Sequence, residues 1–185
     1  MKKKILFFFF LLNISNIGYS AVEEKIVNNF INLKNFSFNF KQSIDDKTEE
    51  GKCIIQYPGK IFCEYNNLKK KIIVSNGKSV VIKHLQGNAY FLYPLEKTPL
   101  KFILNKNYLI QKIKVSKAKL FDEKYYIIKI NSDNTIINIF FDKNTYDFIG
   151  WQTEDIYQNL VITFLYNLKK NFQIKEKIFK LPKPN

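Results

Sequence analysis

Few side chains in this sequence could do covalent chemistry. The one histidine, His84, stands at the predicted end of a strand, where an exposed loop imidazole is the simplest interpretation. Neighbouring side chains on a strand point to opposite faces, so adjacent acidic residues make no acid/base pair. Such pairs fall at predicted loops or strand ends: Asp45-Asp46, Asp122-Glu123 and Glu154-Asp155. No glycine-rich phosphate loop or nucleophile elbow is present, so we predict no catalytic residue, no metal site and no cofactor.

The two cysteines, Cys53 and Cys63, stand on either side of a Pro58-Gly59 turn. If the turn has three residues centred on Pro58, the cysteines face each other across a hairpin. If it has two, the pairing slips by one residue and they point to opposite faces. Both cysteines alternate in phase with apolar neighbours, so two buried free thiols are an equal alternative to a disulfide.

The elements that position these residues are predicted from the spacing of apolar side chains. Between Ala21 and Leu33 they recur every three or four positions, which predicts an amphipathic helix. From Phe36 onward the period is two, which predicts strands, while Pro58-Gly59 and Asn76-Gly77 indicate tight hairpins. Residues 45–51 are predicted as a polar loop. The predicted strands are 36–41, 53–57, 61–65, 72–74, 79–82, 89–93, 119–121, 125–130, 136–141, 148–153 and 160–166.

One short helix interrupts the strands. Thr98 can cap it and Pro99 can occupy its first turn, ahead of an apolar run that ends at Leu104. About ten strands with two helices predict a mainly β fold. We expect a single curved antiparallel sheet that forms an unclosed β-barrel lidded by short helices.

The N-terminus has the three parts of a secretory signal: basic Lys2–Lys4, an apolar run Ile5–Leu12 and small residues at Gly18–Ser20. The apolar run is shorter than the roughly 20 residues that a membrane-spanning helix needs. A buried N-terminal helix is the alternative, which four consecutive phenylalanines disfavour. We predict a cleavable signal peptide at 1–20, cut near Ser20 and Ala21, a periplasmic location and a single domain at 21–185. No cysteine stands at the cut to carry a lipid anchor.

The net charge says little about the partner. The formal charge of +14 becomes +11 without Lys2–Lys4, and all 30 basic residues are lysines scattered along every segment. Nucleic-acid binding usually rests on clustered basic residues and the arginine guanidinium, so no nucleic-acid partner is predicted. Weak attraction to anionic lipid, on the order of 1 kcal/mol per surface lysine, fits an exported protein better.

The aromatic content exceeds what a closed core requires. The chain has 18 Phe, 11 Tyr and one Trp, and each aromatic side chain can bury about 150–250 Å². A sheet curved into an incomplete barrel would present a concave aromatic wall that can hold a lipid or an acyl chain. The alternative is that phenylalanine replaces leucine through an AT-rich coding bias.

Five stretches follow one another over nearly the whole chain after residue 20: Asn35–Gln42, Tyr57–Tyr65, Val74–Lys78, Tyr93–Leu100 and Asp155–Pro182. In order and spacing they resemble the outer-membrane lipoprotein carrier protein family (LolA). The resemblance implies a monomeric periplasmic carrier with acylated lipoproteins as cargo. It further implies an inner-membrane lipoprotein-releasing ABC transporter as donor, an outer-membrane lipoprotein receptor as acceptor, and exchange of acyl chains without bond chemistry.

One position departs from the family pattern. The family usually has an arginine before the Pro-Gly turn that helps to hold the empty cavity shut, and Tyr57 stands there in this sequence. We expect the tyrosine hydroxyl to bond a lid carbonyl instead, with one donor in place of five.

The predicted binding site is the apolar cavity and its lid. Its residues are Phe36, Phe38, Phe40, Ile55, Tyr57, Ile61, Cys63, Tyr65, Val74, Val80, Leu100, Ile103, Leu104 and Trp151. A lipid- or lipoprotein-sensing periplasmic domain of the same fold is the nearest alternative function. A secreted hydrolase with an unrecognised site is the alternative outside this fold.

Overall fold

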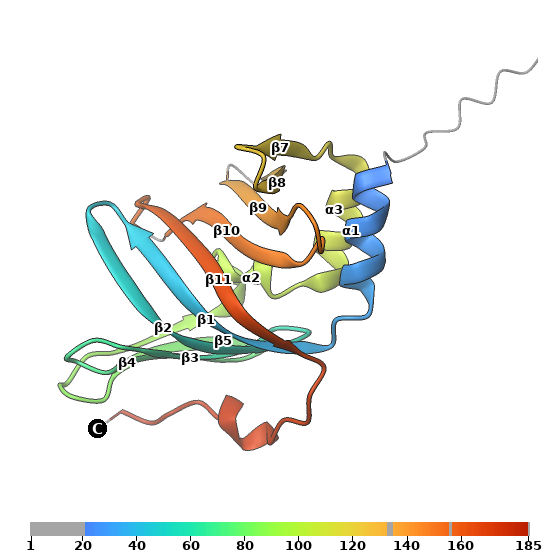
Figure 1. Ribbon diagram of the computed structural model, residues 1–185. Helices are drawn as coiled ribbons and strands as arrows, with labels where there is room; N and C mark the ends of the chain where they lie inside the picture. The colour runs from blue at the N-terminus through green and yellow to red at the C-terminus, as the bar shows by residue number, and fades with distance from the viewer. Residues whose placement is uncertain (1–20, 133–134, 156, 185) are drawn as a thin grey trace, which may run out of the picture.

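The computed structural model describes residues 21–184 except 133–134 and 156 (Figure 1). The predicted signal peptide at 1–20 lies outside the described residues. Eleven antiparallel strands form one sheet in the order β6-β5-β4-β3-β2-β1-β11-β10-β9-β8-β7. With open edges at β6 and β7, the sheet does not close into a barrel, and three α-helices accompany it, which confirms the predicted fold class.

The strands are β1 (Asn35–Ile44), β2 (Lys47–Gln56), β3 (Lys60–Tyr65), β4 (Lys71–Asn76), β5 (Ser79–His84), β6 (Tyr90–Pro94), β7 (Lys119–Phe121), β8 (Tyr125–Ser132), β9 (Thr135–Asp142), β10 (Phe148–Glu154) and β11 (Leu160–Lys170). The α-helices are α1 (Ala21–Ile31), α2 (Leu100–Ile103) and α3 (Lys106–Val115), with short 3₁₀ helices η1 (Leu95–Lys97) and η2 (Glu176–Phe179).

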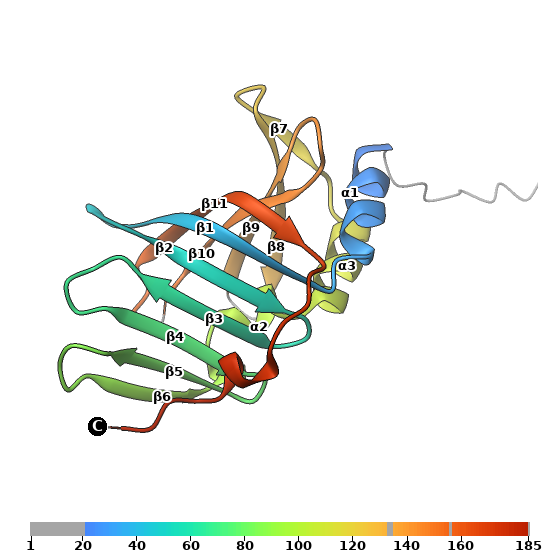
Figure 2. The ribbon, with the colours of Figure 1, turned by 60° about the horizontal axis from the view of Figure 1, so that its bottom comes forward.

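Two meanders make up the sheet. Strands β1 to β6 follow one another in space, as do β7 to β11. β1 also pairs with β11, from Phe36 opposite Lys170 to Ile44 opposite Val161, and so joins the two meanders at the middle of the sheet. Figure 2 shows β1 and β11 side by side in a strongly curved sheet.

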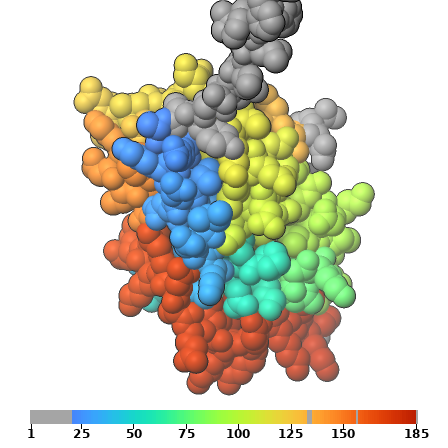
Figure 3. All heavy atoms as spheres, turned by 90° about the vertical axis from the view of Figure 1, so that its right-hand side faces the viewer, coloured from blue at the N-terminus to red at the C-terminus, as the bar shows by residue number. Residues whose placement is uncertain are grey.

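The chain must travel from the edge strand β6 to the opposite edge strand β7, and η1, α2 and α3 make this crossing. Figure 1 shows α2 inside the curve of the sheet, with α3 beside α1 at one end. The space-filling view from that end shows the same two helices in contact (Figure 3). The crossing therefore supplies α2, the lid over the concave face, and α3, one of the two helices that cover its end.

The two packed helices are built from short apolar stripes. α1 buries Ile26, Val27 and Phe30 and carries acidic residues in its first turn, where they complement the helix dipole. Asn105 is the N-cap of α3, and its side chain accepts the Tyr108 backbone N–H at 3.0 Å. Its Leu109, Ile110 and Ile113 are buried. The stripes face the sheet and each other.

The core lies between these helices and the concave face of the sheet. Phe36, Phe38 and Phe40 alternate on one face of β1 and are each at most 2% exposed. The Phe36 ring lies 5.3 Å from Phe38 and 6.0 Å from Phe148. Such separations are those of favourable edge and stacked ring pairs. An aromatic cluster therefore fills the helix-covered end of the concave face.

Three local predictions are corrected by the structure. Residues 45–51 do not form a loop, since a tight turn at Asp45-Asp46 leads directly into β2. The Thr98 hydroxyl donates back to Leu95 O at 2.9 Å and does not cap α2. Helix α3 begins three residues after the end of α2 and was not among the two helices predicted.

The C-terminal segment crosses the convex face of the sheet, as Figure 2 shows. Its helix η2 contacts β3 and β4, and Glu176 accepts from Lys60 Nζ at 2.6 Å and Gln56 Nε2 at 2.5 Å. Phe179 is buried there at 3% exposure. The convex side of β4 is thus covered as well as the concave side.

The aromatic cluster gives a direct test of the core. We expect Phe36→Ala to lower the free energy of unfolding by about 3–5 kcal/mol, because a fully buried ring is removed from among other rings. The control is Phe121→Ala on β7, where the ring is 52% exposed and the loss should stay under about 1 kcal/mol. Equal losses in urea denaturation would contradict this description of the core.

Candidate functional site

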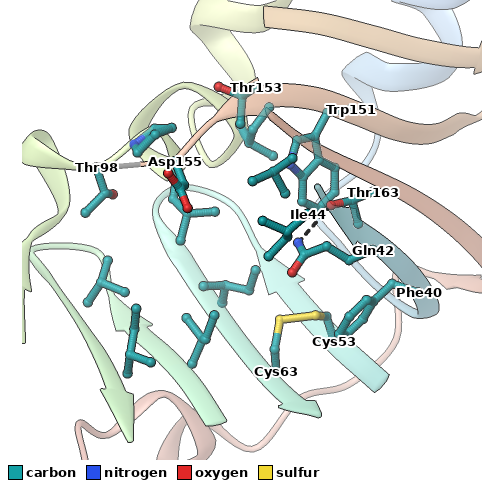
Figure 4. Close-up of a pocket in the computed structure, with 18 of the residues that line it drawn as sticks. Phe40, Gln42, Ile44, Cys53, Cys63, Thr98, Trp151, Thr153, Asp155 and Thr163 are labelled. Atoms are coloured by element: carbon teal, nitrogen blue, oxygen red, sulfur yellow. Dashed lines mark hydrogen bonds between the residues drawn. A yellow bond between two sulfur atoms is a disulfide. The ribbon is translucent and has the colours of Figure 1, made fainter. Parts of the chain in front are cut away.

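A cavity of about 350 Å³ opens on the concave face beyond the helix-covered end. Its wall is built from β1 to β6, β10 and β11, and its cover from Thr98, Pro99, Leu100 and Ile103 at and beside α2 (Figure 4). The volume lies at the small end of the range of roughly 300–1,000 Å³ for small-molecule sites. The lining is predominantly apolar, so the cavity can hold an apolar ligand.

Part of the predicted site lines this cavity. The predicted site residues found there are Phe40, Ile61, Cys63, Tyr65, Val80, Leu100, Ile103 and Trp151. Cys53, which was predicted only as a possible disulfide partner, lines the cavity as well. Together these residues come from β1, β2, β3, β5, β10 and the lid helix α2. The structure therefore brings these residues, which are far apart in the sequence, to one cavity.

Four other predicted residues lie in the packed core and do not line the cavity: Phe36, Phe38, Ile55 and Leu104. Each is 2% exposed or less. Phe36 and Phe38 share the β1 face with Phe40, but they lie nearer the end where α1 and α3 cover the sheet. The alternation along β1 shows that these residues share one face, but it does not show which of them lie in the packed core and which line the cavity.

Val74 points away from the cavity. It pairs with Phe62 and Val81, whereas its neighbour Ile73 pairs with Cys63 and Ile82 and lines the cavity. Val74 is 1% exposed on the convex side of β4, the strand that η2 contacts. Because both faces of this strand are covered, its apolar run gave no indication of which residue faces the cavity.

Several lining residues were missed. Gln42 and Ile44 continue the alternation of Phe36, Phe38 and Phe40, so the β1 pattern could have found them. The remaining ones are Lys71, Ile73, Ile82, Phe91, Tyr93, Thr98, Pro99, Thr153, Glu154, Asp155, Tyr157, Val161 and Thr163. Most lie at the ends of strands or in the loop between β10 and β11, where apolar periodicity carries no signal.

Cys53 and Cys63 form a disulfide in the cavity wall (Figure 4). The turn between β2 and β3 has the three residues Tyr57, Pro58 and Gly59, so the two cysteines stand directly opposite each other. Of the two registers open from the sequence, this one brings the sulfur atoms together. The disulfide thus pins two strands that line the site.

Tyr57 does not bond the lid through its hydroxyl. Its ring packs against Phe30 and Phe36, with centroids 5.9 and 6.1 Å away. The hydroxyl is buried and has no hydrogen-bond partner among the described residues, and burial raises the pKa of Tyr57 far above its usual value. The expected bond from this hydroxyl to a lid carbonyl is therefore wrong.

The lid carbonyl is bonded by the backbone of the same turn. The Gly59 N–H donates to Leu104 O, just after α2, at 2.9 Å. Gly59 has a φ of +77°, and a Cβ there would lie 2.8 Å from Gly77 Cα, so a larger residue would disturb this contact. The turn thus holds the end of the lid helix without a side chain.

Lys106 ties α3 to the end of α1. Its Nζ donates to Ile31 O at 2.8 Å and to Leu33 O at 3.0 Å. Burial, together with the nearby charge of Lys34, lowers the pKa of Lys106. A cation at a helix C-terminus is a favourable partner for the unpaired carbonyls there, so Lys106 joins the start of α3 to the end of α1.

Within the described residues, no group of three or more His, Cys, Asp or Glu side chains could hold a metal ion. In the same part of the chain, no helix is long and apolar enough to cross a membrane. The candidate site is a covered apolar cavity whose wall carries a few polar groups.

The model of the family described as "Outer membrane lipoprotein carrier protein LolA" matches residues 31–182. No curated protein matches the sequence significantly. A LolA superfamily protein from Nitrosomonas europaea is similar in structure, with 8% identity and a TM-score of 0.47 over 90% of this chain and 99% of that chain.

Two further solved structures are similar at the same level. Lipoprotein LppX of Mycobacterium tuberculosis has 8% identity and a TM-score of 0.43, over 84% of this chain and 97% of that chain. A chain of the MucA/MucB complex of Pseudomonas aeruginosa has 9% identity and a TM-score of 0.47, over 87% of this chain and 60% of that chain.

Two tyrosines allow the same substitution to be tested with opposite expected signs. Tyr57→Phe removes a buried hydroxyl without a partner and should raise the free energy of unfolding by about 1 kcal/mol. Tyr65→Phe removes a hydroxyl that donates to Gln42 Oε1 at 3.1 Å and should lower it by about 1–2 kcal/mol. If Tyr57→Phe proves destabilising in urea denaturation, the Tyr57 hydroxyl has a hydrogen-bond partner, and the predicted bond to a lid carbonyl would again be supported.

The disulfide should contribute measurably to stability. For a sequence separation of 10 residues, the loop-entropy relation gives roughly 3 kcal/mol at 25 °C. We expect dithiothreitol to lower the free energy of unfolding by that amount. The Cys53→Ala/Cys63→Ala variant should be insensitive to the reductant, and an equal response of both proteins would argue against the bond.

Proposed function

Because the chain belongs to the outer membrane lipoprotein carrier protein family (LolA), we propose that it is a periplasmic carrier of lipoproteins. It takes the acyl chains of a lipoprotein into its cavity and shuttles the cargo from the inner membrane to the outer membrane. Members of this family bind and carry rather than catalyse, and the present chain acts in the same way, without a cofactor.

The apolar cavity under α2 is the observation that carries this proposal. Its wall and cover present Phe40, Ile61, Val80, Leu100 and Ile103. Acyl chains gain roughly 25 cal/mol for each Å² of apolar surface removed from water. Lipoproteins cannot cross an aqueous space with their chains exposed, so a carrier with such a cavity solves the transport problem by burial alone.

The cargo enters by displacing the lid. At about 350 Å³ the cavity is at the small end of ligand sites, and Leu100 and Ile103 of α2 occupy the space beside it. Helix α2 has four residues, far short of the length at which a helix is stable without packing. Acyl chains replace its apolar side chains against the sheet, which offsets the cost of moving it.

The partners follow from the transport task. The cargo is received from an inner-membrane lipoprotein-releasing ABC transporter and passed to an outer-membrane lipoprotein receptor, each transfer requiring a more favourable next cavity. The chain works as a monomer, and its signal peptide at 1–20 is removed on export, leaving residues 21–185 as the single carrier domain. Its lysines serve no nucleic acid and give only a weak attraction to anionic membranes.

Binding is tested with a synthetic triacylated lipopeptide and the purified protein, by native mass spectrometry and titration. Leu100→Asp places a carboxylate in the lid against the cavity, so we expect roughly tenfold weaker binding or more. The matched control is Val115→Asp at the end of α3, where the side chain is 82% exposed and binding should not change. Failure of the wild type to bind the lipopeptide would overturn the proposal.

Delivery is tested separately by crosslinking in cells. A carrier must contact both a donor in the inner membrane and an acceptor in the outer membrane. Crosslinks to only one membrane, together with normal lipopeptide binding, would indicate a lipid- or lipoprotein-sensing domain of the same fold and contradict the carrier role.

A further inference from the structure

A row of polar side chains crosses the otherwise apolar wall of the cavity. The Tyr65 hydroxyl donates to Gln42 Oε1 at 3.1 Å, and Gln42 Nε2 donates to Thr163 Oγ1 at 2.9 Å. The three residues come from β3, β1 and β11, and all line the cavity. Figure 4 shows Gln42 between the disulfide and Ile44, with its bond to Thr163 dashed.

The row keeps donors for a ligand. A glutamine amide has two N–H groups, and the bonds among the described residues use one of those on Gln42. The Thr163 hydroxyl accepts from Gln42 and keeps its own proton to donate. Burial, and then the nearby Glu49 carboxylate, raise the pKa of Tyr65, so its hydroxyl stays neutral and protonated. The Tyr65 hydroxyl uses its one proton to hold Gln42, while the second Gln42 N–H and the Thr163 hydroxyl are the neutral donors that can bind a carbonyl oxygen.

The charges around the row are already balanced. Lys71 is the only cation among the described residues that line the cavity, and it forms an ion pair with Glu49. The Lys71 Nζ also lies 3.8 Å from the centre of the Tyr65 ring. Glu154 and Asp155 add negative charge to the opposite wall. An incoming anion therefore meets no uncompensated positive charge there.

We propose that the row Tyr65, Gln42 and Thr163 binds the neutral ester and amide carbonyls that join acyl chains to the cargo, and that the cavity rejects free fatty acids. A carbonyl needs only donors, whereas a carboxylate would be buried without a counter-charge in a cavity that two acidic residues also line. The inference rests on the proposed function and adds where the polar end of the cargo lies. The acyl chains then extend past Phe40 and the disulfide.

The two ligand classes are compared by displacement of the fluorescent dye N-phenyl-1-naphthylamine from the purified protein. We expect the affinity for monopalmitoylglycerol to be at least roughly tenfold higher than the affinity for palmitate. Palmitate that competes as well as monopalmitoylglycerol would overturn the selectivity alone. If neither lipid nor the triacylated lipopeptide binds, acyl-chain binding itself fails and the proposed function falls with it.

The row is tested by Gln42→Leu, which should weaken monopalmitoylglycerol binding roughly 3- to 10-fold through loss of the hydrogen bonds. The matched control is Gln152→Leu on β10. Gln152 alternates with the lining residues Trp151 and Thr153 and so faces the other side of the sheet. Equal affinities in Gln42→Leu and wild type would refute the assignment of this row.

A substitution that increases palmitate binding tests the charge argument, because a misfolded variant would lose binding instead. Glu49→Gln releases Lys71 from its carboxylate partner at the cavity. Palmitate should therefore displace the dye from this variant with an affinity at least roughly tenfold higher than from the wild type. Asp122→Asn releases Lys124 in the same way on an exposed turn away from the cavity, and palmitate binding should be unchanged. Palmitate binding that does not rise in Glu49→Gln would refute the charge argument.

Discussion

The pairing of β1 with β11 is the interaction on which the rest of the structure depends. Each meander taken alone is a row of local hairpins, and the concave face exists because these two strands join them. The side chains of β1 consequently lie at the centre of that face. They reach from the helix-covered end at Phe36 to the cavity at Ile44.

One face of one strand is thus used in two ways. Phe36 and Phe38 pack against each other and against rings from β10, and ring centroids 5.3 to 6.5 Å apart leave no room for a ligand there. Phe40, Gln42 and Ile44 face the cavity instead. The difference arises from what stands opposite, since α1 and α3 cover the first half and only the short α2 covers the second. The site is the part of the concave face that the helices leave unfilled.

Sequence reasoning reached the fold because its main signals are local. The alternation in β1 and the turn residues Pro58-Gly59 and Asn76-Gly77 specify strands and hairpins within a few residues of themselves. The disulfide register also follows from the length of one turn. These features depend little on distant parts of the chain.

The site was only half accessible to the same reasoning, because its details are set by distant parts of the chain. Ile73 faces the cavity, while Val74 is buried on the other side of β4, the strand that η2 contacts a hundred residues later, so the apolar pattern alone does not tell the two faces apart. Gln42 belongs to a hydrogen-bonded row whose other members stand on β3 and β11. The hydroxyl of Tyr57 was expected to act as a latch, whereas the Gly59 backbone bonds the lid, a contact that no side-chain pattern encodes.

The central pairing also orders events in time. Phe36 and Lys170 face each other across β1 and β11 although nearly the whole chain separates them, and contacts of such long range form slowly. A chain that emerges N-terminus first has β2 beside β1 early, but it must wait for residues 160–170 before β1 has its second neighbour. The concave face, and the cavity within it, are consequently complete only once β11 has been added.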